Sequence, residues 1–191
     1  MSIPNLAKTD VVYCRGERFR LYLDRETIAA RVAEIGAQIS EDYAGNVPVL
    51  IGVLNGSFMF LADLLRAMDI DCEVDFLKLS SYGASKISSG VVRELKKIDA
   101  DIEGRDVIVV EDIVDTGLSM QFIVDRISEG KPASVRTVTL LHKYEATRVA
   151  TSLDYVGFRI KNLFVIGYGL DYGQLARNLD QIYILDDEEA V

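Results

Sequence analysis

Three carboxylates stand close together in one short stretch of this chain. Glu111 and Asp112 are adjacent, and Asp115 follows three residues later. They come directly after Val107-Ile108-Val109-Val110, a continuous apolar run that is typical of a strand buried on both faces. Acids at the end of such a strand would lie together at one edge of a sheet. There they could bind a cation or the hydroxyl groups of a sugar.

The residues after the acids predict a turn that leads into a helix. The turn contains Thr116, Gly117 and Ser119, and the next apolar residues recur at helical spacing: Met120, Ile123, Val124 and Ile127. Backbone N–H groups of such a loop and the positive end of the helix dipole face one point, which suits an anion. Three acids would repel a phosphate unless a cation or neutral sugar hydroxyls lay between. The stretch therefore predicts a sugar phosphate bound with Mg²⁺, and a buried strand ending in solvated acids is the alternative.

Other segments supply the elements that would position this site. Asp24 is a candidate N-cap for a helix with an apolar stripe from Ile28 to Ile39. A buried strand at 49–54 ends at Asn55-Gly56-Ser57 and precedes another helical pattern, so it could form a second anion-binding turn. Further strands are expected at 72–79, 91–98, 135–141, 164–168 and 182–185.

This alternation of strands and helices predicts an α/β fold with a mainly parallel twisted sheet flanked by helices. We expect a single domain over residues 1–191, with a core at about 25–150. The N-terminal stretch and about 151–191 would form a small hood over the C-terminal edge of the sheet. Residues 80–90 are small, polar and bounded by glycine, which predicts a long flexible hairpin loop that closes as a lid, unless it is only a surface loop.

Composition and charge limit the function. A net charge of −9 over 191 residues argues against a nucleic-acid surface. Cys14 and Cys72 lie far apart, and no apolar run approaches membrane-spanning length, so we expect a cytoplasmic protein that binds neither nucleic acid nor membrane. His142 is the only histidine, which excludes a multi-histidine metal site. Lys143 follows it at the end of a predicted strand, where ligands bind in parallel sheets.

The stretch from Val107 to Ser119 resembles the phosphoribosyl-diphosphate signature of the type I phosphoribosyltransferase family: an apolar strand, two acids, two apolar residues, Asp, Thr and Gly. The resemblance extends over the whole chain to the hypoxanthine-guanine branch of this family. It includes 54–57, 75–83, 140–143 and 164–172, followed by Arg177. It implies a purine salvage enzyme that transfers phosphoribose from phosphoribosyl diphosphate to N9 of hypoxanthine or guanine, giving IMP or GMP and pyrophosphate.

The resemblance also implies a role for each site residue. The catalytic residues would be Glu111 and Asp112, which hold the ribose hydroxyls and Mg²⁺, and Asp115, which handles the proton at purine N7. Asp171 would hold a second Mg²⁺. The remaining substrate-binding residues would be Ile113, Thr116, Gly117, Leu118 and Ser119 around the sugar phosphate; Lys143, Phe164, Val165 and Asp171 around the purine; Leu54, Asn55, Gly56 and Arg177 at the pyrophosphate; and Ser81 and Tyr82 on the lid. The 54–56 turn often contains a non-proline cis peptide in this family.

Two positions depart from the family pattern, and several functions stay open. Many relatives have lysine at the position of Asn55, and some have lysine at the position of Leu118. The loss of both basic groups would shift phosphate binding to backbone N–H groups and Mg²⁺. The alternatives are a transferase of the same fold that prefers xanthine or another base, a non-catalytic regulator that senses phosphoribosyl diphosphate, and a response-regulator-like phosphate-binding domain. Relatives are usually homodimers or homotetramers, and we expect the same here.

Overall fold

The computed structural model describes residues 10–81, 92–149 and 152–186 of the chain. The elements follow in this order: β1 (Val11–Cys14), β2 (Glu17–Leu23), α1 (Arg25–Asp42), β3 (Val49–Leu54), α2 (Phe58–Ala67), β4 (Glu73–Ser81), β5 (Val92–Lys96), β6 (Asp106–Val114), α3 (Leu118–Ser128), β7 (Ser134–Lys143), β8 (Tyr155–Ile160), β9 (Val165–Ile166) and β10 (Ile182–Leu185). In the part of the chain that is described, no helix is long and apolar enough to cross a membrane.

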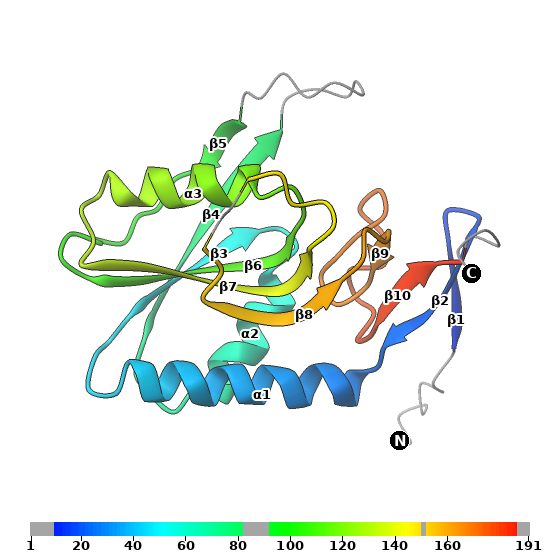
Figure 1. Cartoon of the computed structure of the whole chain (residues 1–191), viewed down its shortest axis with the longest axis horizontal. Coiled ribbons are helices and arrows are strands. Elements are labelled where there is room, and N and C mark those ends of the chain that lie inside the picture. Colours follow the sequence, from blue (N-terminus) through cyan, green and yellow to red (C-terminus); the bar gives the residue numbers. More distant parts are fainter. Residues whose placement is uncertain (1–9, 82–91, 150–151, 187–191) are drawn as a thin grey trace, which may run out of the picture.

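A six-stranded sheet forms the centre of the fold, in the order β5-β4-β3-β6-β7-β8. Strands β4, β3, β6, β7 and β8 run parallel, and only β5 at one edge is antiparallel. The predicted α/β class with a mainly parallel sheet is therefore confirmed. All parallel strands bring their carboxyl ends to the same side, where the candidate site residues were expected (Figure 1).

Helices cover both faces of this sheet (Figure 1). Helices α1 and α2 lie on one face and α3 lies on the other. Side chains alternate between the two faces along each strand: Leu50 packs in the cluster that contains α1 and α2, whereas Val49 and Ile51 pack in the cluster that contains α3. This double burial explains why β3 and β6 read as continuous apolar runs.

Helix α1 begins where the sequence predicts. The Asp24 side chain accepts a hydrogen bond from the Thr27 N–H at 2.8 Å, so it is the N-cap. The apolar stripe from Ile28 to Ile39 is buried against the sheet.

A second, four-stranded sheet in the order β1-β2-β10-β9 forms the hood beside the carboxyl ends of the large sheet (Figure 1). Its strand pairs are antiparallel. Strand β8 does not belong to it, although we expected residues after about 150 in the hood: β8 pairs in parallel with β7 and extends the large sheet to Ile160. The strand expected over 164–168 also shortens to β9, because the chain turns at Gly167, where φ is +96°.

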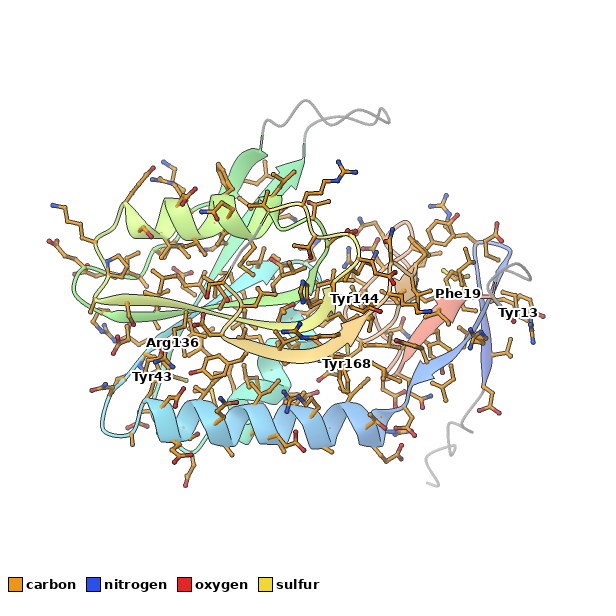
Figure 2. The ribbon with its side chains drawn as sticks, in the orientation of Figure 1. Tyr13, Phe19, Tyr43, Arg136, Tyr144 and Tyr168 are labelled. Atoms are coloured by element: carbon orange, nitrogen blue, oxygen red, sulfur yellow. The ribbon has the colours of Figure 1, made fainter. Side chains whose placement is uncertain are left out.

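A polar cluster joins the elements at the opposite, amino end of the large sheet. Arg136 donates to Asp42 at 2.7 Å and to the Tyr155 hydroxyl at 2.8 Å, and its guanidinium lies over the Tyr43 ring. Figure 2 shows Tyr43 and Arg136 at this end and Phe19 at the hood end. These contacts fasten the end of α1 to β7 and β8, and they lie remote from the hood.

Candidate functional site

Glu111 and Asp112, which we call the acid pair, lie inside β6 and not after it as the sequence suggested. The reason is that β7 continues to pair with β6 beyond the acids, as far as Val114. On the other side, pairing with β3 stops at Val110, where β3 approaches its turn. The acids therefore occupy the last part of a strand that is no longer paired with β3 on one side, and this leaves space beside them.

Burial disfavours the charged forms of the acid pair. Asp112 is only 8% exposed, and its carboxylate accepts a hydrogen bond from the Ile113 N–H at 3.0 Å. Burial, together with the neighbouring Asp112 carboxylate, raises the pKa of Glu111 well above its ordinary value. Burial also raises the pKa of Asp112, although the positive charge of Arg177 opposes the shift. A cation at this place would relieve the repulsion between the two carboxylates.

The turn between β6 and α3 has the geometry of an anion site. Gly117 occupies the N-cap position of α3 with φ +84°, a conformation that favours glycine, and it has no side chain to accept hydrogen bonds from the first helical turn. The Thr116 carbonyl accepts hydrogen bonds from the N–H groups of Arg148 and Val149, which fixes the turn against the segment after β7. Ser119 is exposed at the start of the helix. This arrangement can receive a phosphate group.

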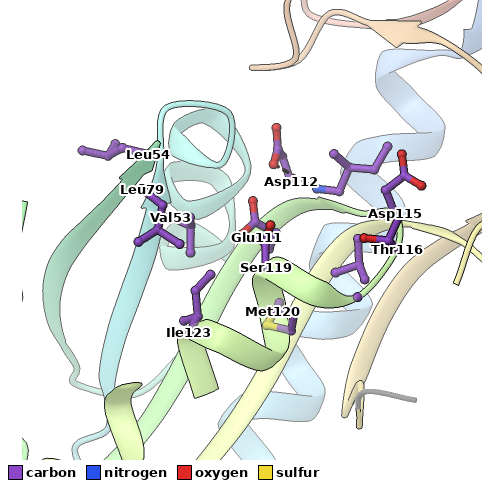
Figure 3. Close-up of a pocket in the computed structure, with 13 residues that line it drawn as sticks. Val53, Leu54, Leu79, Glu111, Asp112, Asp115, Thr116, Ser119, Met120 and Ile123 are labelled. Carbon is purple, nitrogen blue, oxygen red and sulfur yellow. Dashed lines mark hydrogen bonds between the residues drawn. The ribbon is translucent and has the colours of Figure 1, made fainter. Parts of the chain in front are cut away.

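A cavity of about 260 Å³ opens between this turn and the end of β3. Figure 3 shows Val53, Leu79 and Ile123 together on one side, while Asp112 and Asp115 lie on the other. The cavity has both acidic and apolar walls, as a site for a sugar phosphate would need. Its lining residues are Val53, Leu54, Leu79, Glu111, Asp112, Ile113, Val114, Asp115, Thr116, Gly117, Ser119, Met120 and Ile123.

Lys143 reaches the same edge from the end of β7. Its Nζ lies 3.3 Å from Oδ2 of Asp115, and its side chain is 12% exposed, whereas that of Asp115 is 50% exposed. A nearly buried donor thus stands beside an accessible acceptor. The preceding His142 shares a local hydrogen bond with the Thr147 hydroxyl at 2.9 Å.

The turn after β3 packs directly against the acid pair. The Leu54–Asn55 peptide bond is cis, as the resemblance suggested. At Gly56, a Cβ atom would lie 1.6 Å from Oδ2 of Asp112, so a side chain here would displace the Asp112 carboxylate. Ser57 is fully buried and donates to the Val53 carbonyl at 2.7 Å. The backbone of this turn therefore forms the wall next to Asp112.

Arg177 and Asp171 face each other in the hood. The Arg177 guanidinium lies 2.7 Å from Oδ1 of Asp171 and donates to the Gly169 carbonyl at 2.8 Å. Oδ2 of Asp171 accepts from the Gln174 N–H at 2.7 Å. In this state Asp171 is engaged within the hood, and a metal ion would have to replace Arg177 as its partner.

Phe164 does not line the acidic cavity. Its side chain is 45% exposed and lines a separate hood cavity of about 330 Å³ with Glu17, Tyr172 and Leu185. Val165 next to it is buried in β9. Of the expected lid residues, Ser81 ends β4, and Tyr82 lies outside the described residues.

Sequence reasoning missed two residues that pack around the site, Leu79 and Gly169. Leu79 lines the cavity, and Gly169 lies so close to Gly56 that a Cβ atom on it would be 2.0 Å from the Gly56 carbonyl oxygen. The glycines around Tyr168 were visible in the chain, but no periodicity indicates which distant backbone they touch. Only the folded arrangement reveals this contact.

The model of the phosphoribosyl transferase domain family matches residues 21–173, from the hood strand β2 to the segment that follows β9. The chain therefore belongs to the phosphoribosyltransferase family. Among curated proteins, it is 42% identical over 174 residues to the hypoxanthine-guanine phosphoribosyltransferase of Aquifex aeolicus, with 91% of this chain and 98% of that protein covered. It is 45% identical over 177 residues to that of Mycobacterium tuberculosis, with 90% and 88% covered.

Solved structures agree with this grouping. A hypoxanthine-guanine phosphoribosyltransferase from Bacillus anthracis, crystallised with HEPES in the active site, superimposes with a TM-score of 0.83 at 41% identity and covers 86% of this chain and 97% of its own. A ternary substrates complex of a mutant hypoxanthine phosphoribosyltransferase from Trypanosoma cruzi gives a TM-score of 0.82 at 44% identity, with 88% and 95% covered. Within the family, the chain thus groups with the hypoxanthine-guanine phosphoribosyltransferases.

Proposed function

We propose that this protein transfers the 5-phosphoribosyl group from phosphoribosyl diphosphate to N9 of hypoxanthine or guanine, releasing pyrophosphate in purine salvage. One observation carries the proposal. The acid pair at the end of β6, the glycine-capped start of α3 and the Lys143–Asp115 pair meet at one sheet edge in a chain of this family. Together they offer separate partners for ribose hydroxyls, a phosphate and a purine.

The sugar phosphate would bind along the turn after β6. Carboxylates of the acid pair accept hydrogen bonds from the two ribose hydroxyls, and the backbone N–H groups at residues 116–119 donate to the 5′-phosphate. The hydroxyls of Thr116 and Ser119 add further donors. The apolar wall around Ile123 excludes water from the sugar ring, which protects the cationic transition state from hydrolysis.

The purine would be recognised along its edge that carries N7 and the C6 oxygen. Lys143 donates to the C6 oxygen. When N9 attacks the sugar, Asp115 accepts the proton that N7 loses. The 3.3 Å between the two side chains suits adjacent atoms of one purine edge. Adenine has an amino group at C6, which would face the Lys143 donor without a partner, so 6-oxopurines are favoured. Phe164 stacks on the ring, and the backbone of Val165 and Asp171 reads the 2-position.

The diphosphate would bind between the Leu54–Gly56 turn and Arg177. Asn55 contributes no charge there, and Leu118 at the start of α3 is 52% exposed and apolar, so the backbone N–H groups take a larger share of the binding. Arg177 exchanges its partner Asp171 for the leaving group and stabilises its charge.

Mg²⁺ fits this donor set as an ion that arrives with its substrate. The described residues hold no group of three or more His, Cys, Asp or Glu side chains arranged for a metal, but Mg²⁺ normally takes one or two carboxylates plus water and phosphate oxygens. The acid pair would hold one ion and Asp171 a second. When bound, Mg²⁺ neutralises charge on the departing pyrophosphate.

The test is pyrophosphate release from phosphoribosyl diphosphate with hypoxanthine, guanine, xanthine or adenine offered separately. We expect turnover with hypoxanthine and guanine, almost none with adenine, and loss of all turnover when EDTA removes Mg²⁺. Preferred use of xanthine would support the alternative base specificity. Binding of phosphoribosyl diphosphate without turnover of any base would support a sensing role and refute the transferase.

We also propose a cytoplasmic location and a homodimer or homotetramer, by analogy with the family. Both cysteines are free, which suits a reducing compartment. Light scattering of the purified protein would give its oligomeric state, and fractionation of cells that produce it would give its location.

A further inference from the structure

Tyr168 lies in an unusual backbone conformation at the junction of the hood and the large sheet. Its φ is +51°, between two glycines whose φ angles are +96°, and a non-glycine residue in this region carries strain. Its N–H donates to the Leu179 carbonyl at 2.8 Å, and its side chain is only 5% exposed. Contacts of the side chain must therefore hold this turn in place.

The main polar contact of Tyr168 is with helix α2. Its hydroxyl donates to Oδ2 of Asp63 at 2.6 Å, while Oδ1 of Asp63 pairs with Arg66 at 2.7 Å. Burial and the Asp63 charge raise the pKa of Tyr168, so the phenol stays protonated and remains a donor. A partly exposed acid on α2 thus anchors a buried tyrosine of the hood.

The residue after Tyr168 presses on the candidate site. Gly169 meets the Gly56 carbonyl, and Gly56 in turn meets the Asp112 carboxylate, both so closely that a Cβ atom would clash. Gly169 also exchanges two hydrogen bonds with Arg177: its N–H donates to the Arg177 carbonyl, and its carbonyl accepts from the guanidinium. A shift of this turn would therefore move Gly56, Asp112 and Arg177 together.

The contacts form a closed ring. The 54–57 turn leads directly into α2, α2 carries Asp63, Asp63 holds Tyr168, and the residue after Tyr168 rests on Gly56. Because the ring returns to the turn where it starts, the Asp63–Tyr168 hydrogen bond sets how closely the hood approaches the turn. No member of this hydrogen bond lines the acidic cavity.

We propose that Asp63 and Tyr168 are positioning residues for the reaction, and that their hydrogen bond holds the Leu54–Gly56 turn, Asp112 and Arg177 in the arrangement that binds the diphosphate. The inference rests on the proposed function and adds to it two residues that touch neither substrate. Lys143 and Asp115 at the C6 and N7 edge of the purine stand outside the ring, and hypoxanthine has no 2-substituent for Val165 and Asp171 to read, so the diphosphate constants should change more than the KM for hypoxanthine.

The test compares Tyr168→Phe, which removes only the hydroxyl, with wild type. We expect the KM for phosphoribosyl diphosphate and the inhibition constant of pyrophosphate each to rise about tenfold, from the loss of a hydrogen bond to a charged group. The KM for hypoxanthine should change less than about twofold. Asp63→Ala should reproduce the effect, and the double variant should lose no more than either single variant, because both remove one interaction.

Two further variants separate positioning from general stability. Asp63→Asn keeps an oxygen that accepts from Tyr168 and should restore most of the diphosphate binding. Arg66→Ala removes the ion-pair partner of Asp63. The Arg66 side chain is 74% exposed, so this variant should behave as wild type. The unfolding temperature of each variant shows whether that variant must be assayed at lower temperature. If Asp63→Ala does not fold, Tyr168→Phe is sufficient for the test.

The inference is overturned if diphosphate constants stay at the wild-type level although Tyr168→Phe lowers the unfolding temperature, or if the KM values of both substrates rise equally. An Asp63→Asn variant as impaired as Asp63→Ala also overturns it. These results differ from failure of the proposed function, which would show as no turnover in the wild-type protein.

Discussion

Replacing Asp75 with asparagine tests how the β4–β5 hairpin is held. The Asp75 side chain is 11% exposed and accepts hydrogen bonds from Lys96 at 2.9 Å, from the Phe76 N–H at 2.6 Å, and from the N–H groups of Asp99 and Ala100 at 2.5 and 2.9 Å. These contacts fix the exit of β5. Asparagine keeps the shape of the side chain and removes its charge.

The magnitude follows from the pKa of Asp75. Although burial opposes it, these hydrogen bonds lower the pKa from 3.8 to about 2. A depressed pKa in the folded state means that ionised Asp75 stabilises the fold above its unfolded pKa and that this contribution disappears as pH falls through the folded pKa. A shift of nearly two pH units corresponds to about 2.5 kcal/mol at pH 7 and about 1.3 kcal/mol at pH 3.

Urea unfolding followed by circular dichroism between pH 3 and pH 7 measures this difference. We expect Asp75→Asn to lower the free energy of unfolding by about 2.5 kcal/mol at pH 7, with the gap to wild type halved at pH 3. Asp99→Asn is the matched control: Asp99 shares Lys96 but is 86% exposed, so its loss should cost less than about 0.5 kcal/mol. A gap that does not depend on pH, or an equal cost at Asp99, would refute the reasoning.

Four further changes test the site itself. Asp115→Asn should lower kcat about 100-fold and leave phosphoribosyl diphosphate binding within about threefold, as steady-state kinetics and calorimetry would show, because only proton handling is lost. Lys143→Ala should narrow the preference for hypoxanthine over adenine, and an unchanged ratio of kcat/KM values would remove the specificity role. Glu111→Gln should make the protein more stable at pH 7 in thermal unfolding but nearly inactive: because the pKa of Glu111 is raised in the folded state, the stability cost of ionising it grows as pH rises from the unfolded pKa to the folded pKa and then stays constant. Gly56→Ala should abolish pyrophosphate release, since its Cβ would displace the Asp112 carboxylate, while circular dichroism shows that the protein stays folded. A fully active variant would contradict the close contact.

The sequence predicted the elements whose physics is local. The apolar run of β6 and the N-cap Asp24 can be recognised from the sequence, because periodicity and side-chain chemistry act within a few residues. The contiguous signature from Glu111 to Ser119 likewise placed the acids and the anion turn on one edge of the sheet. Its boundary was misjudged, since pairing with β7 keeps the acids within the strand, and strand pairing is not a local property.

Contacts between distant segments could not be predicted in this way. Strand β8 has no stronger apolar pattern than a hood strand, and only its pairing with β7 assigns it to the large sheet. Asp75 looks like one of thirty acids in the chain, yet it accepts from two backbone N–H groups that lie 24 and 25 residues away. The role of such residues depends on where the chain returns to itself.

The charges of the site divide into pairs with different consequences for binding. Lys143–Asp115 and Arg177–Asp171 are ion pairs that keep their side chains near the expected ligand positions before any ligand arrives. Among the described residues the acid pair has no ion-pair partner, and burial disfavours its charged forms, so a ligand that brings positive charge or hydroxyl donors gains most there. Under the proposed function, the ion pairs would orient the ligands, and the acid pair at the end of β6 would contribute most to holding a metal-bound sugar diphosphate.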